Sequence, residues 1–412
     1  MANVSSSNGL EKRPKLRFPG FDEPWQSTLL SSVFAKNTKK NTDGQITNVI
    51  CNSAKQGLIP QREYFDKDIA NSDNTNGYYI IEENDFVYNP RKSADAPYGP
   101  ISRYKYAEAG IVSPLYLCFR AKTEINPAFF EWYFRSSAWH RYVYMSGDSG
   151  ARHDRVSIKD DTFLAMPINL PAAHEQEHIA SFLERIDQRI EMQRALVENL
   201  KKYKRGLLSR EFAPSAHNTS NIEYEGKILD YFSLSSGSTP SSTNKSFYSG
   251  NIRWVSSGEL KPKYLCETNQ HISAEAVLSC NLREYPANTL LIAMYGLEAA
   301  GVRGTASILN VPATISQACM AIQQTGEIDI EYLYYWYIYN GQWIGIRIAQ
   351  GTKQQNLSTE TLGNLKINAP SSSKQKKVCK LLSQIDNLIE KESQKIDLLY
   401  AVKKSFLQQL FI

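Results

Sequence analysis

Histidine and cysteine side chains could supply metal ligands or nucleophiles, and the 412 residues offer few such arrangements. His174 and His178 are four residues apart and could share a metal ion on one face of a helix. Both fall at the start of a helical pattern, and no further ligand set completes a site, so a solvated helix end is the favoured interpretation. The six cysteines form no CxxC pair, which is typical of buried, reduced thiols. We expect no metal site.

The motifs of nucleotide and acyl-transfer chemistry are also missing. The sequence contains no GxxxxGK[ST] phosphate loop, no GxGxxG fingerprint and no GxSxG nucleophile elbow. Asn89-Pro90 continues into Arg91, so the Asn/Asp-Pro-Pro-aromatic motif of amino-methyltransferases is absent as well. The chain is also internally duplicated, and a duplicated chain without these motifs is predicted to bind a partner rather than to catalyse a reaction.

An internal repeat organises the chain. The segment from Pro171 to Phe212 aligns without a gap with the segment from Pro370 to Phe411, at a constant offset of 199 residues. In both segments apolar residues recur at alternating steps of four and three, which predicts the seam of a coiled coil. The predicted seam residues are Ile179, Leu183, Ile186, Ile190, Val197, Leu200, Val378, Leu382, Ile385, Ile389, Ile396 and Leu399.

Both seams carry polar residues at matching places, Gln193 with Glu392 and Lys204 with Lys403. Buried polar residues in such a seam commonly fix its register or orientation. About 35 residues at 1.5 Å each make a rod of roughly 50 Å, which exceeds the usual helix of a globular domain. The two stripes are therefore predicted to pack against each other; the alternative is that each helix packs separately on its own domain.

The remaining sequence forms two blocks that mix short β-like runs, Gly/Pro/Asn turns and one aromatic helix. Each aromatic helix carries two tryptophans seven residues apart, Trp132 with Trp139 and Trp336 with Trp343, which should share a helix face packed on a sheet. The predicted strands include residues 85–88, 115–119, 289–293 and 318–322. The predicted plan is an arm at 1–24, a domain at 25–170, a long helix at 171–212, a polar linker at 213–221, a domain at 222–369 and a long helix at 370–412.

Composition permits a nucleic-acid surface without demanding one. The chain has 47 Lys and Arg against 42 Asp and Glu, and a pI near 8.6. No apolar run is long enough to span a bilayer, and the first residues lack the apolar core of a signal peptide. We therefore expect a cytoplasmic protein without a membrane partner.

Four ordered motifs of the second block resemble the specificity (S) subunits of Type I restriction–modification enzymes: Gly237–Leu260, Leu290–Gly296, Ile315–Cys319 and Gly351–Ser358. The opening stretch from Lys15 to Phe21, with Trp25, is similar to the usual start of that family. The first block matches more loosely, through Asp85–Asn89 and the stretch that begins at Gly150. The resemblance spans nearly the whole chain.

The resemblance implies an α+β fold in which two globular α/β target-recognition domains are held apart by two long antiparallel helices, in a duplicated chain with pseudo-two-fold symmetry. Each domain would read one half of an asymmetric bipartite site in double-stranded DNA, and the helix pair would set the spacer. The chain itself would be non-catalytic. Two methyltransferase (M) subunits would dock on the helices and restriction (R) subunits would join them. S-adenosylmethionine, ATP and Mg²⁺ would belong to these partners, with no cofactor in this chain.

Turn segments after the predicted strands are the best candidates for DNA contacts. Basic groups bind phosphates, whereas a few bidentate side chains discriminate bases, Arg suiting guanine and Asn or Gln suiting adenine. The alternative for Ser256-Ser257-Gly258 and Gly351-Thr352 is that they only shape turns. The candidates are Arg91, Lys92, Ser93, Arg152, His153 and Arg155 in the first domain, and Thr239, Ser256, Ser257, Tyr295, Lys353, Gln354, Gln355 and Asn356 in the second.

Two other classes of function stay open. One is an enzyme that cuts or methylates DNA alone, against which the missing motifs argue. The other is a coiled-coil scaffold whose two end domains bind proteins and not DNA. Binding to DNA that weakens steeply as salt rises would separate these classes, because phosphate contacts release counterions.

Overall fold

A computed structural model of the chain describes residues 13–64, 75–147, 154–213, 222–297, 299, 301–349 and 356–412. The chain divides into two compact units. Unit 1 comprises Met1–Arg194 and Gln394–Ile412, and unit 2 comprises Ala195–Ser393. The two boundaries, after Arg194 and after Ser393, are related by the same offset of 199 residues that relates the two halves of the sequence. Each unit holds one globular domain and one half of each long helix.

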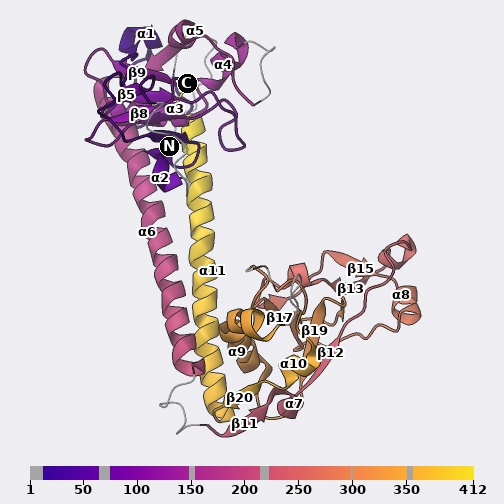
Figure 1. Cartoon of the computed structure of the whole chain (residues 1–412). Helices are drawn as coiled ribbons and strands as arrows, with labels where there is room; N and C mark the ends of the chain where they lie inside the picture. The colour runs from indigo at the N-terminus through magenta and orange to yellow at the C-terminus, as the bar shows by residue number, and fades with distance from the viewer. Residues whose placement is uncertain are drawn as a thin grey trace. The chain divides into compact units, whose positions relative to one another are not determined.

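Two uninterrupted helices, α6 (Ala173–Phe212) and α11 (Ser372–Gln409), form the predicted long elements (Figure 1). The 40 residues of α6 span about 60 Å at 1.5 Å per residue. Neither helix contains proline, and both carry the four-three apolar pattern from which they were predicted. No helix among the described residues has the length and apolarity that crossing a membrane would need.

The contacts within each unit show that α6 and α11 are antiparallel. In unit 1, the rings of Phe182 and Phe406 pack edge to face with centroids 4.9 Å apart. In unit 2, Leu208 near the end of α6 shares a core with Cys379 and Leu382 near the start of α11. The beginning of each helix therefore lies beside the end of the other, which confirms the predicted antiparallel pair.

Two ion pairs across this helix pair are copies of one interaction. In unit 1 the Lys403 ammonium contacts the Asp187 carboxylate, and in unit 2 the Lys204 ammonium contacts the Asp386 carboxylate. Asp187 aligns with Asp386, and Lys204 with Lys403, under the 199-residue offset. Burial lowers the pKa of Lys403, and the hydrogen bond to Asp187 partly opposes that shift. The two halves of the repeat therefore exchange equivalent partners, one ion pair in each unit.

All twelve predicted seam residues lie in the described part of the helices, and none of the twelve is exposed. Six of them are buried and six are half-buried. Gln193 and Glu392, the matching polar positions, are each 7% exposed. The buried ones are Ile179, Leu183, Ile190, Val197, Leu382 and Ile385.

The domain of unit 1 is built on a four-stranded antiparallel sheet in the order β2-β9-β6-β7. Its strands are β2 (Phe34–Lys36), β9 (Leu117–Ala121), β6 (Phe86–Tyr88) and β7 (Ile101–Arg103). Three two-stranded ladders join it: β1 (Gln26–Leu29) with β10 (Pro167–Leu170), β3 (Ile50–Ser53) with β4 (Gly57–Pro60), and β5 (Tyr79–Ile81) with β8 (Gly110–Val112). The short helices are α1 (Leu30–Val33), α2 (Gln61–Tyr64), α3 (Pro127–Arg135), α4 (His140–Ser146) and α5 (Asp160–Leu164).

Unit 2 repeats this order as β12-β19-β16-β17 and adds β14 at the edge. These strands are β12 (Phe232–Ser236), β19 (Cys319–Gln324), β16 (Leu290–Ala293), β17 (Ala306–Leu309) and β14 (Tyr264–Leu265). A second sheet pairs β15 (Gln270–Ile272), β13 (Ile252–Val255) and β18 (Thr314–Ile315), and a ladder pairs β11 (Tyr224–Lys227) with β20 (Lys366–Ala369). The helices of the domain are α7 (Ile228–Tyr231), α8 (Ala274–Ser279), α9 (Ile330–Trp343) and α10 (Thr359–Gly363).

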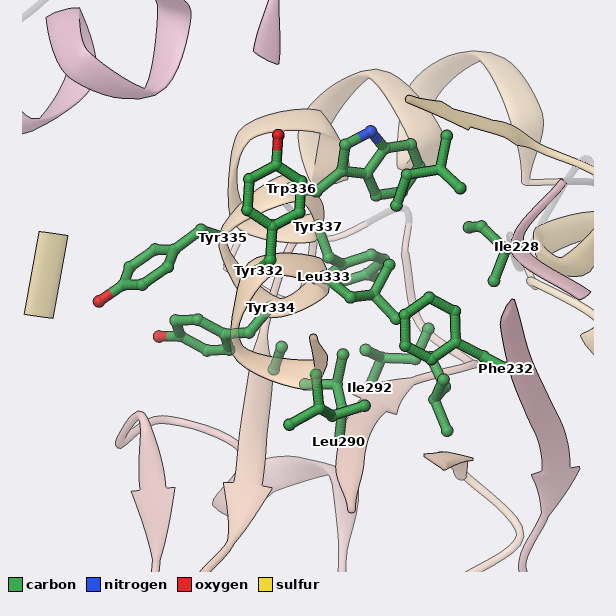
Figure 2. Packing of buried hydrophobic residues seen from close by; sticks show 14 of the residues in the cluster. Ile228, Phe232, Leu290, Ile292, Tyr332, Leu333, Tyr334, Tyr335, Trp336 and Tyr337 are labelled. Carbon is green, nitrogen blue, oxygen red and sulfur yellow. The ribbon is translucent and has the colours of Figure 1, made fainter. Parts of the chain in front are cut away.

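The four strands predicted from the sequence are confirmed as β6, β9, β16 and β19, with bounds shifted by up to two residues. Helix α9 covers the sheet of unit 2 with Leu333 and Tyr337, which point toward Phe232 and β16 (Figure 2). Full burial of one such side chain stabilises a fold by about 1.5–3 kcal/mol. The two domains therefore share a duplicated architecture, with an aromatic helix packed on the sheet in each.

The prediction that the two tryptophans of each pair share one helix face packed on a sheet is wrong. Helix α3 ends at Arg135 because Ser136 is extended, so Trp139 lies outside it and precedes α4. Trp343, at the end of α9, is 51% exposed and does not share the buried environment of Trp336.

The helix caps give the true correspondence between α3 and α9. Counted from the capping residues Asn126 and Asp329, Trp132 matches Tyr335. The ammonium of Lys403 lies 4.7 Å from the Trp132 ring centroid, and that of Lys204 lies 5.6 Å from the Tyr335 ring centroid. Each aromatic helix thus contacts the lysine of the seam ion pair in its own unit.

Reversal of the Lys204–Asp386 pair tests this contact. Lys204→Asp alone or Asp386→Lys alone should lower the free energy of unfolding by about 1–3 kcal/mol, because each leaves two like charges in a partly buried site. The double exchange should recover most of that loss, since opposite charges face each other again. Denaturant unfolding curves measure both effects.

The exposed pair Glu198–Lys201 on the same helix is the matched control, and its reversal should leave the curve unchanged. A double exchange no more stable than the worse single variant would contradict the pairing.

Candidate nucleic-acid interface

The sheet of unit 2 brings several loops to one edge. Strands β12 and β16 both run antiparallel to β19, with Ser236 opposite Met320 and Ala293 opposite Cys319. The carboxyl ends of β12 and β16 therefore meet the beginning of β19. The loops that follow β12 and β16, and the turn that precedes β19, emerge together at this edge.

The second sheet of unit 2 adds its own turns to the same edge. Strand β13 runs parallel to β18, with Val255 opposite Ile315, and the Ser316 amide donates to the Val255 carbonyl over 2.9 Å. The Gln317 amide donates to the Thr239 hydroxyl oxygen over 3.2 Å. The turn Ser316–Gln317 therefore lies between the segments that follow β12 and β13.

Five predicted contact residues of the second domain lie on these segments. The Leu357 amide donates to the Met294 carbonyl over 2.8 Å, which places the neighbouring residues Asn356 and Tyr295 close together. The structure thus brings together positions that are up to 117 residues apart in the sequence, from 239 to 356. The five are Thr239, Ser256, Ser257, Tyr295 and Asn356.

Local hydrogen bonds and exposure distinguish residues that shape turns from residues that are exposed for contact with a ligand. The Ser256 amide and hydroxyl both donate to the Glu259 carboxylate, over 2.9 and 2.7 Å, which supports the turn-shaping interpretation of Ser256. Tyr295 is exposed. Gln317 is also exposed, between the segments of Thr239 and Ser256, and the sequence reasoning missed it. The signal was available, because Gln317 lies within the Ile315–Cys319 motif.

The corresponding edge in unit 1 carries a basic turn. The Lys92 amide donates to the Asp154 carbonyl and the Val156 amide to the Pro90 carbonyl, each over 2.8 Å, and Arg91 and Arg155 form an antiparallel bridge between these two segments. Arg91, Lys92 and Ser93 are exposed, while Arg155 is half-buried.

Two adjacent concavities, of about 410 and 470 Å³, flank Arg155. Pro90, Leu115 and Tyr116 line both of them, and Leu115 is 60% exposed. Burial raises the pKa of Tyr116, and the charge of Arg155 opposes that shift. The phenol is therefore neutral at physiological pH and retains its hydroxyl proton. A surface with a guanidinium, an aromatic ring and an exposed leucine can accept planar, polar groups.

The other five predicted contact residues lie outside the described residues. Two of them directly precede Asp154 in the sequence, and three directly precede Asn356. They are Arg152, His153, Lys353, Gln354 and Gln355.

The stretch from His174 to His178 fits the HExxH pattern of zinc hydrolases, a match that the sequence reasoning overlooked. The structure gives this stretch another role. The catalytic position of the motif, Glu175, is 1% exposed and accepts two hydrogen bonds from Arg17, over 2.8 and 2.7 Å. Both imidazole rings pack against Phe21. The motif therefore anchors the arm before the first domain to the start of α6.

One other group among the described residues could hold a metal ion: Asp329, Glu331 and Cys379. Asp329 caps α9 by accepting the Glu331 amide, and the Glu331 carboxylate pairs with Lys263. Burial raises the pKa of the Cys379 thiol, which disfavours the thiolate that binds metals. These contacts already engage the two carboxylates, so the group fits a structural role.

The family model for the Type I restriction modification DNA specificity domain matches residues 23–202 and again residues 221–400. The chain belongs to this family. Each match spans one globular domain and most of the long helix that follows it.

A relative agrees with this assignment. The chain is 28% identical over 190 residues to the Type I restriction enzyme MjaIX specificity subunit of Methanocaldococcus jannaschii. The aligned part covers 45% of this chain and 43% of that relative, so it spans less than half of each.

The solved structures cover nearly the whole chain. A chain of the type I R-M system, studied for complex assembly and conformational transition, aligns with a TM-score of 0.64 at 15% identity, over 94% of this chain and 97% of that one. The HsdS subunit from Thermoanaerobacter tengcongensis aligns with a TM-score of 0.54 at 16% identity, over 97% and 98%. At these identities they show a common fold, which confirms the predicted duplicated α+β architecture with its long helices.

Lys92 and Lys122 offer a matched test of which edge of the first domain binds DNA. Lys92 follows β6 at the basic edge, whereas Lys122 follows β9 at the opposite edge. Lys92→Ala should weaken binding to all DNA sequences similarly and should reduce the slope of log K against log salt by about one, because one phosphate contact is lost. Lys122→Ala should change neither. Salt titrations of DNA binding check both variants, and equal effects would contradict the assignment of the edge.

Proposed function

We propose that this chain is the DNA sequence-specificity subunit of a Type I restriction–modification complex and that it has no catalytic activity of its own. The observation that carries the proposal is that the model of the specificity domain matches the chain twice, over 23–202 and over 221–400. In each of the two domains so matched, loops gather at one edge of the sheet. Those edges expose groups suited to phosphates and bases, such as Arg91 and Tyr295.

Each domain reads one half of a bipartite site in double-stranded DNA. The edge of the sheet at which the loops gather carries Arg91-Lys92 after β6 in unit 1. The equivalent edge in unit 2 carries Tyr295-Gly296 after β16. Because the side chains at matching places differ, the two half-sites differ and the whole site is asymmetric. The phosphate contacts position each domain, and a few side chains read base edges.

The helix pair sets the spacer and receives the methyltransferase subunits. Two half-sites one helical turn apart on the same face of a duplex are separated by about 34–36 Å, and α6, at about 60 Å, is longer than that separation. The helices also expose large apolar residues, which usually mark surfaces for partner proteins. On α6 these are Met192, Leu196 and Tyr203, and on α11 they include Leu381, Leu388 and Leu398.

Two M subunits dock on this apolar surface and R subunits join them. S-adenosylmethionine, ATP and Mg²⁺ are bound by those partners, and the complex acts in the cytoplasm, where the DNA is accessible.

Selection from a library of randomised duplexes tests the function directly. The full-length chain should enrich a consensus of two short blocks separated by a fixed, unspecified spacer, and its affinity should fall steeply with salt. The chain alone should neither cut nor methylate the enriched DNA. Binding without any consensus, or no binding to DNA, would refute the proposal and would favour a scaffold for proteins.

Lengthening of both helices tests the role of the helix pair. Seven residues that continue the four-three pattern, inserted after Arg194 and after Ser393, add about 10 Å to each helix, which is the rise of about three base pairs. Both half-site sequences should stay unchanged while the preferred spacer length changes. A changed half-site with an unchanged spacer would contradict the proposed ruler.

A further inference from the structure

In both domains an equivalent hydrogen bond joins a later segment of the chain to the segment that follows the central strand, β6 in unit 1 and β16 in unit 2. In unit 1 the Val156 amide donates to the Pro90 carbonyl, and in unit 2 the Leu357 amide donates to the Met294 carbonyl, over 2.8 Å in each case. A later segment of the chain is thus tied to the same point of the sheet in both domains.

The strand registers give the same alignment independently. Phe34 and Phe232, which begin the edge strands β2 and β12, lie opposite Ala121 and Gln324, so Phe119 is equivalent to Ile322. In β6, Phe86 lies opposite Phe119, and in β16, Leu290 lies opposite Ile322. Pro90 is four residues beyond Phe86, and Met294 is four residues beyond Leu290. The residues next to the shared hydrogen bond are therefore equivalent: Arg91 with Tyr295, and Arg155 with Asn356.

Arg155 is placed as a recognition group. It lies directly opposite Arg91 in an antiparallel bridge, so the two side chains leave the backbone on the same side. Its Nε atom is buried without a hydrogen-bond partner, and no ion pair within the described residues engages its guanidinium. The side chain lines both concavities of the basic edge. A donor left without a partner in such a position costs free energy until a ligand supplies an acceptor.

Asn356 has the same property in unit 2. It is half-buried, and its Oδ1 atom is buried without a hydrogen-bond partner in the described part of the chain. The neighbouring Tyr295 is exposed. An acceptor held in this way matches a ligand that donates a hydrogen bond.

We propose that Arg155 and Asn356 are equivalent base-reading positions, with Arg155 reading a guanine in one half-site and Asn356 reading an adenine in the other. This inference rests on the proposed function. Arg donates two hydrogen bonds to O6 and N7 of guanine, and Asn donates to N7 and accepts from N6 of adenine.

The burial of the two side chains separates base reading from phosphate binding. Phosphate contacts need only an accessible cation, and the exposed Lys92 supplies one. A base reader must be held in place so that only one base edge fits. Arg155 and Asn356 meet that requirement, because each adjoins a residue whose amide is bonded to the sheet edge.

Two conservative variants test the assignment in the full-length chain by selection from randomised duplexes. Arg155→Lys keeps the charge and loses the planar fork, whereas Asn356→Asp keeps the shape and loses the donor. Each should reduce the preference for its base at one position by roughly 10-fold or more. The half-site read by the other domain should stay unchanged in each variant, which shows that the protein is folded.

The outcomes distinguish this assignment from the proposed function. A wild-type chain that enriches no bipartite consensus overturns both. A wild-type consensus that both variants leave intact overturns the assignment alone. Weaker binding to all sequences with an unchanged consensus also overturns it, because that result identifies phosphate contacts.

Discussion

The structure depends on the antiparallel seam between α6 and α11, to which each helix contributes one aspartate and one lysine at equivalent positions of the repeat. Asp187 meets Lys403 and Asp386 meets Lys204, and the two pairs coincide under the 199-residue offset. A parallel arrangement would set the two aspartates against each other and the two lysines against each other. Since like charges in a partly buried site are strongly unfavourable, these four residues favour the antiparallel orientation over the parallel one.

Each globular domain is attached to this seam through its aromatic helix. In unit 1 the Phe129 ring packs on Phe411, with centroids 5.6 Å apart, and in unit 2 the Tyr332 ring packs on Phe212, with centroids 5.1 Å apart. Phe411 and Phe212 are again equivalent in the repeat. Recognition groups on a sheet that is packed on such a helix are held more rigidly than groups on isolated loops. The seam therefore fixes the orientation of the sheet edge within each unit.

The periodicity of apolar residues made the long helices and the main strands predictable. The ends of the shorter helices, and the alignment of the two domains, depend on contacts that the periodicity does not contain. The four-three stripe of α6 and α11 is a local signal repeated over many turns, so a single sequence suffices to predict it. The seven-residue spacing of Trp132 and Trp139 suggested one helix, but Ser136 ends α3 between them, and only the caps at Asn126 and Asp329 give the true alignment.

The candidate site was predictable in its residues but not in its assembly. Turn chemistry after each strand pointed to Thr239, Tyr295 and Asn356, yet their proximity follows from the registers of β12, β16 and β19, which no local pattern encodes. Gln317 lies within the Ile315–Cys319 motif, which marked it in the sequence, but its place beside Thr239 depends on the pairing of β13 with β18 and could not be predicted. The HExxH match shows the converse, because the local pattern is present but the side chain at its catalytic position, Glu175, is hydrogen-bonded to Arg17.

Cysteine cross-linking across the seam tests the antiparallel pairing most directly. The pair Phe182→Cys and Phe406→Cys should form one intrachain cross-link with a short bifunctional reagent, because the two rings are in contact. The pair Phe182→Cys and Leu381→Cys, which a parallel seam would align, should form none, since 25 residues of α11 separate positions 381 and 406 by about 37 Å. Peptide mapping by mass spectrometry identifies the linked positions. A cross-link between 182 and 381, with none between 182 and 406, would contradict the account.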